Sequence, residues 1–309
     1  MPDSILTGTL PERVSASVAK ARAYLRSRQS AEGGFCFYRY EDVDEPNLRD
    51  TYHGVLALKL LAEPVPDLDK LLRFLDGARL FGLGYLYWYA FTLDLIGLAS
   101  RIDAQRMAWI RGLDVELLLE GARPGERRAW LEDTRRKVRL KTRFAQPWTS
   151  ERLMECLPAQ RTEGGYGDRP NLWDTLSSLT ILDCLGCRKE MQASVPFVER
   201  MQVLPFGFSL TEGSRMPNLE VVRAGCRCCA LLGLPIRHRI EVLELAVACQ
   251  TADGGFSRTP TALPNIDLTY QALQVFGLAA RDGVLPGRTG MEGATGQRDR
   301  LGLRGSGAG

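Results

Sequence analysis

The chain has 309 residues, of which 45% are hydrophobic and 25% are charged, and its formal net charge at pH 7 is +3. This is the composition of an ordinary soluble globular protein, long enough to bury a large core in one or two domains. The charge excess is too small to require a nucleic acid or an anionic membrane as partner, so any basic function must be local.

The chain begins with residues 1–17, which have neither the basic nor the apolar region of a secretory signal and which we assign to an N-terminal segment before the fold. The most apolar stretch, residues 80–99, contains Asp94 and falls short of the roughly 18 uninterrupted apolar residues of a membrane-spanning helix. The eight cysteines lie in apolar runs such as AGCRCCALLG, where free thiols pack as small hydrophobic side chains. We therefore expect a soluble, cytoplasmic protein without a transmembrane segment.

Four stretches of the chain repeat one pattern, and they begin at Gly33, Gly164, Gly207 and Gly254. Each has a glycine–aromatic turn, a variable loop, Pro-Asn followed by Leu or Ile, and then small and apolar residues at helical spacing. In three of the four copies a threonine stands five residues after the proline, at Thr51, Thr175 and Thr269. Because proline keeps the residue before it extended and asparagine can accept free amide hydrogens, each Pro-Asn predicts the start of a helix.

A second helix is predicted before the glycine turns. Amphipathic segments end at a polar residue just ahead of the glycines, at residues 18–28, 152–160 and 240–250. Glycine after a periodic run stops a helix, so one unit consists of a helix, a glycine turn, a loop and a second helix. Residues 71–99 keep the apolar helix of such a unit and lose the Pro-Asn. The sequence therefore predicts an all-α protein of about five to six helix pairs.

Residues 101–150 interrupt the repeat spacing and carry a basic run. Nine Lys or Arg lie between Arg123 and Arg143, against three acidic residues. Either this basic insertion is a solvated helix pair that fills the position of one repeat, or it is a lip that attracts phosphate-bearing ligands or an acidic partner. Residues 283–309 are rich in glycine and contain no aromatic residue, so we expect a disordered tail.

The units CQTADGGF…PNIDLTYQALQVFGLA and RQSAEGGF…PNLRDTYHGVLALKLL resemble the repeats of protein prenyltransferase β subunits and of squalene and diterpene cyclases, over about residues 18–282. The resemblance implies an α/α toroid of concentric helices, whose inner ring lines an aromatic-rich cavity that accepts an isoprenoid chain. The candidate substrate-binding residues in this cavity are Phe35, Tyr52, His53, Tyr166, Trp173 and Tyr270. Aromatic faces can hold a prenyl chain and stabilise a carbocation. The competing interpretation is that these side chains only fill the core between helices.

The resemblance also raises the question of whether this chain has a zinc site, because protein prenyltransferases hold zinc with Asp, Cys and His to activate the acceptor thiol. When the family pattern KLPDxCYS is laid on RMPNLEVVR, the aspartate and cysteine positions hold Asn218 and Glu220. The histidine of the following repeat falls on Tyr270. The usual zinc ligands are therefore not matched, no metal ligand is predicted, and the cofactor stays unknown. Arg215 keeps the charge of the phosphate-contacting lysine of that pattern.

Class II cyclases, by the same resemblance, protonate an alkene or epoxide with the middle aspartate of DxDD. In NIDLTYQAL that position is Asp267, and in NLRDTYHGV only the last acid is kept, as Asp50. We therefore name Asp267 and Asp50 as candidate catalytic residues, a role that needs a desolvated carboxyl with a tuned pKa. The stretch DVDE at residues 42–45 resembles DxDD in spelling and lies too early in the chain, before Pro46.

Two cysteine groups admit two interpretations. Cys184 and Cys187 form CxxC, and residues 226–229 form CxCC, so thiolate metal sites are conceivable. Both groups fall inside predicted apolar helices, and the spacing of the second fits no common zinc module. Buried structural thiols are the favoured interpretation.

The leading functional hypothesis is an isoprenoid-handling protein of the prenyltransferase and terpene-cyclase type. A prenyl diphosphate or terpene chain would lie in the aromatic cavity, with Arg215, Arg258 or the basic run neutralising the diphosphate. The alternative is a toroid without catalysis that binds a lipid or a protein, including a partner subunit. A nucleic-acid binder is disfavoured, because no recognition motif accompanies the basic run.

Overall fold

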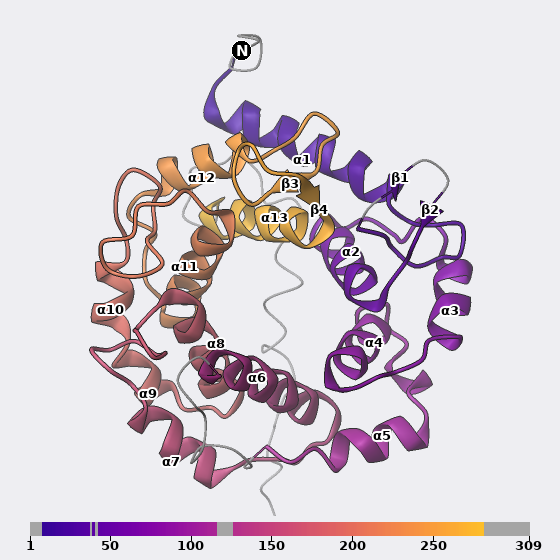
Figure 1. Cartoon of the computed structure of the whole chain (residues 1–309), viewed down its shortest axis with the longest axis horizontal. Helices are drawn as coiled ribbons and strands as arrows, with labels where there is room; N and C mark the ends of the chain where they lie inside the picture. Colours follow the sequence, from indigo (N-terminus) through magenta and orange to yellow (C-terminus); the bar gives the residue numbers. More distant parts are fainter. Residues whose placement is uncertain (1–7, 38, 41–42, 116–125, 281–309) are drawn as a thin grey trace, which may run out of the picture.

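The computed structural model describes residues 8–37, 39–40, 43–115 and 126–280. Helices arranged in two concentric rings make up the fold (Figure 1). The inner ring consists of α2 (Leu48–Leu60), α4 (Leu83–Leu95), α6 (Arg127–Phe144), α8 (Leu172–Cys184), α11 (Leu219–Leu232) and α13 (Ile266–Ala280). Each of these helices contacts the next, and α13 contacts α2, so the inner ring is closed.

The outer ring consists of α1 (Leu10–Ser27), α3 (Leu68–Asp76), α5 (Ala104–Arg111), α7 (Glu151–Ala159), α9 (Arg188–Gln192), α10 (Val195–Arg200) and α12 (Arg239–Ala248) (Figure 1). A short 3-10 helix, η1 (Ala99–Arg101), follows α4. Outer and inner helices alternate along the chain, with α9 and α10 sharing one outer position. The predicted helix pairs are therefore confirmed.

Strands are confined to two short hairpins in the described residues. Strand β1 (Arg39–Tyr40) pairs with β2 (Val43–Asp44), and β3 (Phe256–Ser257) pairs with β4 (Pro264–Asn265), both antiparallel. The buried apolar side chains form one continuous core, which joins the outer helices to the outward faces of the inner helices. This leaves the inward faces of the inner ring to form a site.

The Pro-Asn motifs lie at the starts of inner helices, as predicted. In each of them the asparagine is the residue before the helix, and its side chain accepts a hydrogen bond from a backbone N–H of the first turn. The donors are the backbone N–H groups of Asp50 at 2.9 Å, Asp174 at 3.0 Å, Glu220 at 2.9 Å and Leu268 at 2.7 Å. An asparagine cap satisfies amide hydrogens that have no partner inside the helix. The motif therefore fixes where α2, α8, α11 and α13 begin.

The repeated threonine has a different task from the cap. The Thr269 hydroxyl accepts a hydrogen bond from the Phe256 N–H at 3.0 Å and donates one to the Asn265 carbonyl at 2.7 Å. Thr51 makes the same two bonds, with the Phe35 N–H and the Asn47 carbonyl. The threonine thus ties the loop after the glycine turn to the first turn of the inner helix.

Thr269→Val should lower the free energy of unfolding by about 1–3 kcal/mol, because the buried N–H of Phe256 loses its acceptor. Urea unfolding measures this loss. The matched control is Thr180→Val, since the Thr180 hydroxyl only donates to the Leu176 carbonyl four residues earlier in its own helix, and removing it should have little effect. Equal effects of the two substitutions would contradict the role assigned to the repeated threonine.

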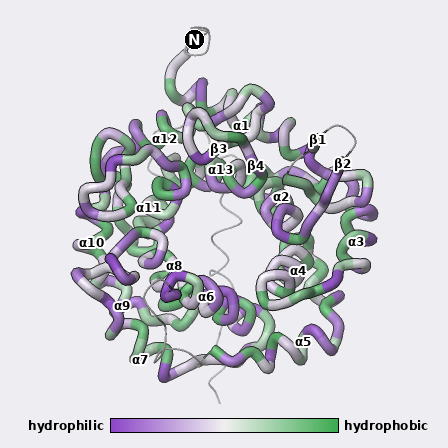
Figure 2. Tube along the Cα trace, viewed as in Figure 1, coloured by the Kyte–Doolittle hydropathy of each residue, from purple (hydrophilic) through white to green (hydrophobic). Residues whose placement is uncertain are grey.

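The basic segment fills the position of one repeat, as the helix-pair interpretation held. Its first helix, α5, lies in the outer ring, and its basic helix, α6, lies in the inner ring between α4 and α8. The structure departs from that interpretation in one respect, because α6 is part of the inner wall and is not a solvated appendage. In Figure 2, α6 is largely hydrophilic, whereas α13 is largely hydrophobic. One inner helix thus brings arginines into the ring.

The first helix begins at Leu10, inside the segment that the sequence placed before the fold. The signal was present, because Thr9 is followed three residues later by Glu12, and the Thr9 N–H donates to the Glu12 carboxylate at 2.8 Å. The tail expected at residues 283–309 lies outside the described residues. Asp42 of the DVDE stretch also lies outside them.

Candidate functional site

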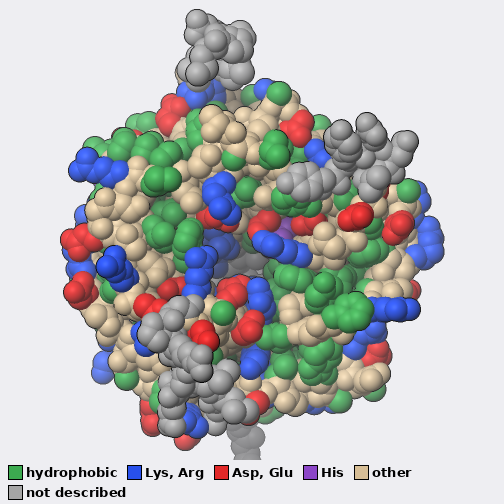
Figure 3. Space-filling view, in the orientation of Figure 1, with side chains coloured by type: hydrophobic (Ala, Val, Ile, Leu, Met, Phe, Trp, Pro, Cys, Tyr) green, Lys and Arg blue, Asp and Glu red, His purple; other side chains and the backbone are tan. Residues whose placement is uncertain are grey.

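The inner ring surrounds a hollow (Figure 3). Side chains of Lys and Arg and of Asp and Glu gather around it, and a patch of hydrophobic side chains lies beside it. Because ligand sites are concave, the hollow is the natural place for a ligand site in this fold.

No helix in the described part of the chain is both long and apolar enough to cross a membrane.

Four arginines from two inner helices form what we call the basic wall of the hollow: Arg135 and Arg139 on α6, and Arg223 and Arg227 on α11. All four side chains are half-buried. Within each pair the arginines are four residues apart, so they project from the same face of their helix. The two helices are not neighbours in the ring, because α8 lies between them.

Arg139 shows that the basic wall faces the centre. Its guanidinium donates a hydrogen bond to the Tyr87 hydroxyl on α4. It also lies in electrostatic range of Tyr52 on α2, Tyr270 on α13 and Cys184 on α8, and of Arg227 on α11. Only a side chain inside the ring can reach groups on every other inner helix.

Aromatic side chains from α2, α4 and α13 form the opposite part of the interior, which we call the aromatic side: Tyr52, Tyr87 and Tyr270. The Tyr52 and Tyr87 rings meet edge to face, with centroids 5.6 Å apart. Tyr270 stacks on His53 of α2 at 5.9 Å. Tyr52 and Tyr87 are buried, whereas Tyr270 and His53 are half-buried and therefore accessible from the hollow. The interior is thus aromatic on one side and cationic on the other.

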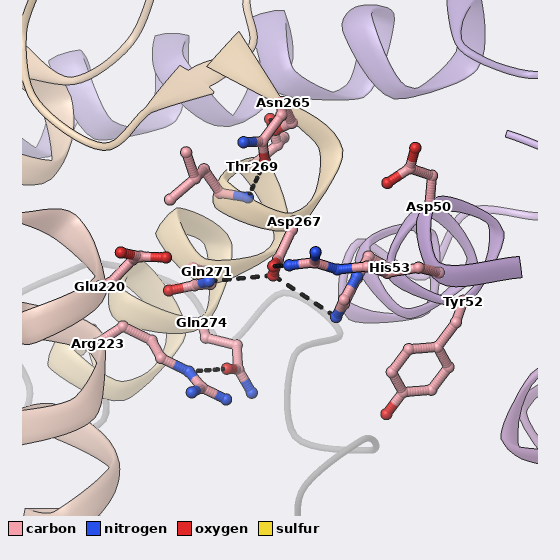
Figure 4. A network of polar contacts seen from close by, with 12 residues as sticks. Asp50, Tyr52, His53, Glu220, Arg223, Asn265, Asp267, Thr269, Gln271 and Gln274 are labelled. Carbon is pink, nitrogen blue, oxygen red and sulfur yellow. Dashed lines mark hydrogen bonds and ion pairs between the residues drawn. The ribbon is translucent and has the colours of Figure 1, made fainter. Parts of the chain in front are cut away.

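Asp267 lies where α13 meets α2, in a network of polar contacts (Figure 4). Its carboxylate accepts hydrogen bonds from Arg49 at 2.9 Å and from Gln271 at 3.0 Å, and it lies 3.5 Å from Nε2 of His53. Burial alone would raise the pKa of Asp267, but His53, Gln271 and Arg49 together lower it to about 2. The carboxyl is therefore ionised at neutral pH. The proton-donating role expected of Asp267 does not suit these surroundings.

His53 is neutral at pH 7 in this network. Burial lowers its pKa, and Arg49 and Arg223 act in the same direction, whereas Asp267 acts against them. Nδ1 of His53 is buried and has no hydrogen-bond partner in the described protein, so Nε2 is the nitrogen that faces Asp267. His53 is thus a neutral, aromatic member of the cavity wall.

Asp50, the second acid candidate, has a structural task. It is buried, and its carboxylate accepts a hydrogen bond from the side chain of the capping residue Asn47 at 2.7 Å. Asp174 makes the same bond with Asn171, at 2.7 Å, at the start of α8. Burial raises the pKa of both carboxyls. Because the arrangement repeats at two helix starts, Asp50 takes part in helix capping, and its catalytic role stays a prediction.

Arg215 and Arg258 lie in loops before inner helices. The Arg215 side chain is exposed, so its place does not mark it as part of the cavity wall. Arg258 forms an ion pair with Glu220 at 2.9 Å. Trp173 is half-buried at the start of α8, and the Arg128 guanidinium lies over its ring at 4.2 Å. The structure therefore brings Arg258 and Trp173 to the end of the ring where the inner helices begin, each with a partner of its own.

Phe35 and Tyr166 belong to the core and not to the cavity wall. Their exposed fractions are 0% and 1%. The Phe35 ring lies against Gly54 of α2, where an added Cβ would come within 2.7 Å of it. Both aromatic residues follow a glycine turn and fill the space between the two rings. The core-filling interpretation is therefore correct for them.

The residues at the aligned zinc positions do not fit a zinc site. The Asn218 side chain caps α11, and the Glu220 carboxylate is paired with Arg258. The third position, Tyr270, stacks on His53. Among the described residues, no group of three or more His, Cys, Asp or Glu side chains is placed to hold a metal ion. An amide, a paired carboxylate and a phenol are a poor donor set for zinc.

The cysteine groups pack as thiols. Cys226, Cys228 and Cys229 are buried in α11, and all eight cysteines are free. Burial raises the pKa of the Cys226 thiol, which disfavours the thiolate that a metal or a nucleophilic role requires. The buried-thiol interpretation is confirmed for this group.

Sequence reasoning missed the basic wall. It noted α6 only as part of a charged run, and it placed Arg223 and Arg227 in an apolar helix without comment. A usable signal was the spacing of four residues in both pairs, which puts two positive charges on one helix face. Such a pair on an inner helix points either to solvent or to the hollow.

Comparisons with known proteins agree with this architecture. The model of the family described as prenyltransferase alpha-alpha toroid domain matches residues 4–81 and 82–285. No curated protein matches the chain. Several solved structures of the type II terpene cyclase MstE from Scytonema are similar in fold.

The similarity to this cyclase extends over nearly its whole length. A variant in complex with geranylgeranyl dihydroxybenzoate, its substrate, has a TM-score of 0.60 and 13% identity, and the match covers 88% of this chain and 99% of the cyclase chain. A variant with merosterolic acid A, a product, gives 0.55 and 14%, covering 88% and 98%. The apo enzyme gives 0.56 and 14%, with the same coverage of 88% and 98%. At such identity the likeness concerns the fold.

Proposed function

The chain belongs to the prenyltransferase alpha-alpha toroid domain family, and on this premise we propose that it binds an isoprenoid ligand inside its inner ring. The observation that carries the proposal is the two-sided interior, with the aromatic side facing the basic wall. A prenyl or terpene chain has no polar group to bury, and aromatic rings are the surface that suits it. A solved structure of the cyclase with this fold is a complex with geranylgeranyl dihydroxybenzoate, its substrate, which supports the ligand class.

In this proposal Tyr270 and His53 form the accessible part of the aromatic surface. Both are half-buried and stacked on each other, so they present ring faces to the hollow. Asp267 holds His53 and Arg49 in place at the junction of α13 and α2. It acts as a positioning residue and not as a proton donor.

We expect Tyr270→Ala to weaken the binding of farnesol and of farnesyl diphosphate by about three- to tenfold each, because both ligands lose an aromatic contact of about 0.5–1.5 kcal/mol. Isothermal titration calorimetry of each ligand measures this. The matched control is Tyr166→Phe in the core, which should leave both affinities unchanged. If wild-type protein binds neither ligand, the proposal fails.

A binding role without turnover is the second candidate, and two observations favour it. Asp267 is ionised at neutral pH, and the aligned zinc positions hold an unsuitable donor set. Incubation with farnesyl diphosphate, followed by extraction and gas chromatography, separates the two candidates. Unchanged ligand in the presence of demonstrated binding supports the role without turnover, whereas a cyclised or transferred product supports catalysis.

A further inference from the structure

Four aromatic rings follow one another along the inner ring from α2 through α4 to α6, and we call them the aromatic row: Tyr52, Tyr87, Phe91 and Phe144. Neighbouring ring centroids in this order are 5.6, 4.7 and 5.3 Å apart. The three helices are consecutive in the inner ring (Figure 1). Aromatic ring faces carry negative potential, so they attract a cation within an otherwise apolar wall. The aromatic row is therefore the part of this interior best suited to a positively charged ligand or intermediate.

The guanidinium of Arg139 already lies against the aromatic row. Its central carbon is 4.8 Å from the ring centroid of Phe91 and 5.4 Å from that of Tyr87, both within the roughly 6 Å range of a cation–π interaction. It also donates a hydrogen bond to the Tyr87 hydroxyl. Among the described residues it has no ion pair, whereas Arg135 on the same helix pairs with Glu132 at 3.0 Å. Two aromatic rings and a phenol hydroxyl thus hold this charge in place.

The charge of Arg139 is permanent, because a guanidinium is not deprotonated in proteins. Arg135 and Arg227 lie in electrostatic range of it, so these neighbours add to the positive potential. Two like charges a few ångströms apart inside a protein repel each other strongly. A second cation could lie against the same rings only by displacing the guanidinium or by bearing this repulsion.

We propose that Arg139 determines ligand specificity by filling the cation-binding place of the aromatic row with the protein's own positive charge. The interior then accepts an uncharged isoprenoid chain and rejects a cationic one. A carbocation formed along a bound chain belongs to the rejected class, since the rings that would stabilise it already face a guanidinium. The inference rests on the proposed function only where it concerns the isoprenoid chain, because the filled aromatic row is a property of the protein alone.

The test is an NMR titration with tetramethylammonium, a compact permanent cation of the kind that aromatic cages bind. Arg139→Ala vacates the space of the guanidinium itself, so the probe needs no other cavity. This variant should bind tetramethylammonium about tenfold or more tightly than wild type does. The matched control is Arg128→Ala on the same helix, whose exposed guanidinium lies over the single ring of Trp173 at 4.2 Å, and it should bind as weakly as wild type. No gain for Arg139→Ala, or an equal gain in both variants, would overturn the inference.

A second pair of variants separates charge from space and from folding. Arg139→Lys keeps the positive charge and should reject tetramethylammonium as wild type does. Arg139→Gln removes the charge while keeping a polar group of intermediate length, and it should bind the probe even if Arg139→Ala does not fold. A folded variant that binds the probe should also gain thermal stability when the probe is added, whereas wild type should not. Binding of the probe by Arg139→Lys and not by Arg139→Gln would contradict the role of the charge.

The isoprenoid arm compares farnesol with farnesyltrimethylammonium by calorimetry. Wild type should bind farnesol about tenfold or more tightly than the ammonium compound, and Arg139→Ala should remove this preference. If wild type binds neither compound, the proposed function fails, and the tetramethylammonium titration still decides the role of Arg139. If wild type binds both equally, or converts farnesyl diphosphate to a cyclised product, the inference is wrong while isoprenoid binding stands.

Discussion

Gly254→Ala should lower the free energy of unfolding by about 3 kcal/mol or more, since it combines backbone strain with a steric clash. Gly254 has φ near +92°, in the left-handed region that disfavours a side chain. A Cβ at this position would come within 2.5 Å of the Lys20 carbonyl oxygen on α1. Because the obstacle is backbone of another helix, the clash cannot be relieved by moving a flexible side chain. Chemical denaturation with circular dichroism measures the loss.

The matched control is Gly233→Ala at the end of α11. Gly233 also has positive φ, at +71°, but an added Cβ would meet nothing within 4 Å. That substitution should cost only about 1 kcal/mol, the conformational part of the effect. If the two glycines respond equally, close approach to α1 is not what Gly254 provides.

The glycine turns also show what the sequence revealed and what it could not. The Gly-Gly signal and the Pro-Asn signal are local, so they correctly predicted where helices end and begin. The glycines of these turns also pack against helices that are distant in the sequence. Gly33 lies against the backbone of Lys70 on α3 and Gly254 against that of Lys20 on α1, so each of these turns packs on the next outer helix around the ring. No periodicity shows which distant helix a turn will meet.

The candidate site was harder to predict for the same reason. The resemblance assigned roles position by position, and it favoured Arg215, which the structure places on an exposed loop. The arginines that do face the interior lie on α6 and α11, and only closure of the ring brings Arg139 near Arg227. The sequence singled out Asp267, which lies where α13 contacts α2. The ionisation of its carboxyl depends on Arg49 and His53, which lie near the opposite end of the chain.

Asp267→Asn should lower the free energy of unfolding at pH 7 by about 2 kcal/mol, because the pKa of Asp267 falls from an ordinary 3.8 to about 2 on folding. Since the folded pKa is the lower one, the unfolded chain takes up the proton first as the pH falls. The contribution is therefore complete above the unfolded pKa of 3.8 and is lost as the pH falls toward 2. Urea unfolding at pH 7, 5 and 3 should show the variant approaching wild type as the pH falls.

Asp50→Asn is the control for this pH dependence, because burial raises the pKa of Asp50 instead of lowering it. For a raised pKa the sign reverses, since the folded protein takes up the proton first and gains stability as the pH falls through the folded value. The stability of Asp50→Asn relative to wild type should therefore fall as the pH falls, in the opposite direction to that of Asp267→Asn. If both variants instead gain stability relative to wild type in acid, the change reflects general acid unfolding. In that case the Asp267 carboxylate does not hold α13 to α2 through Arg49 and His53.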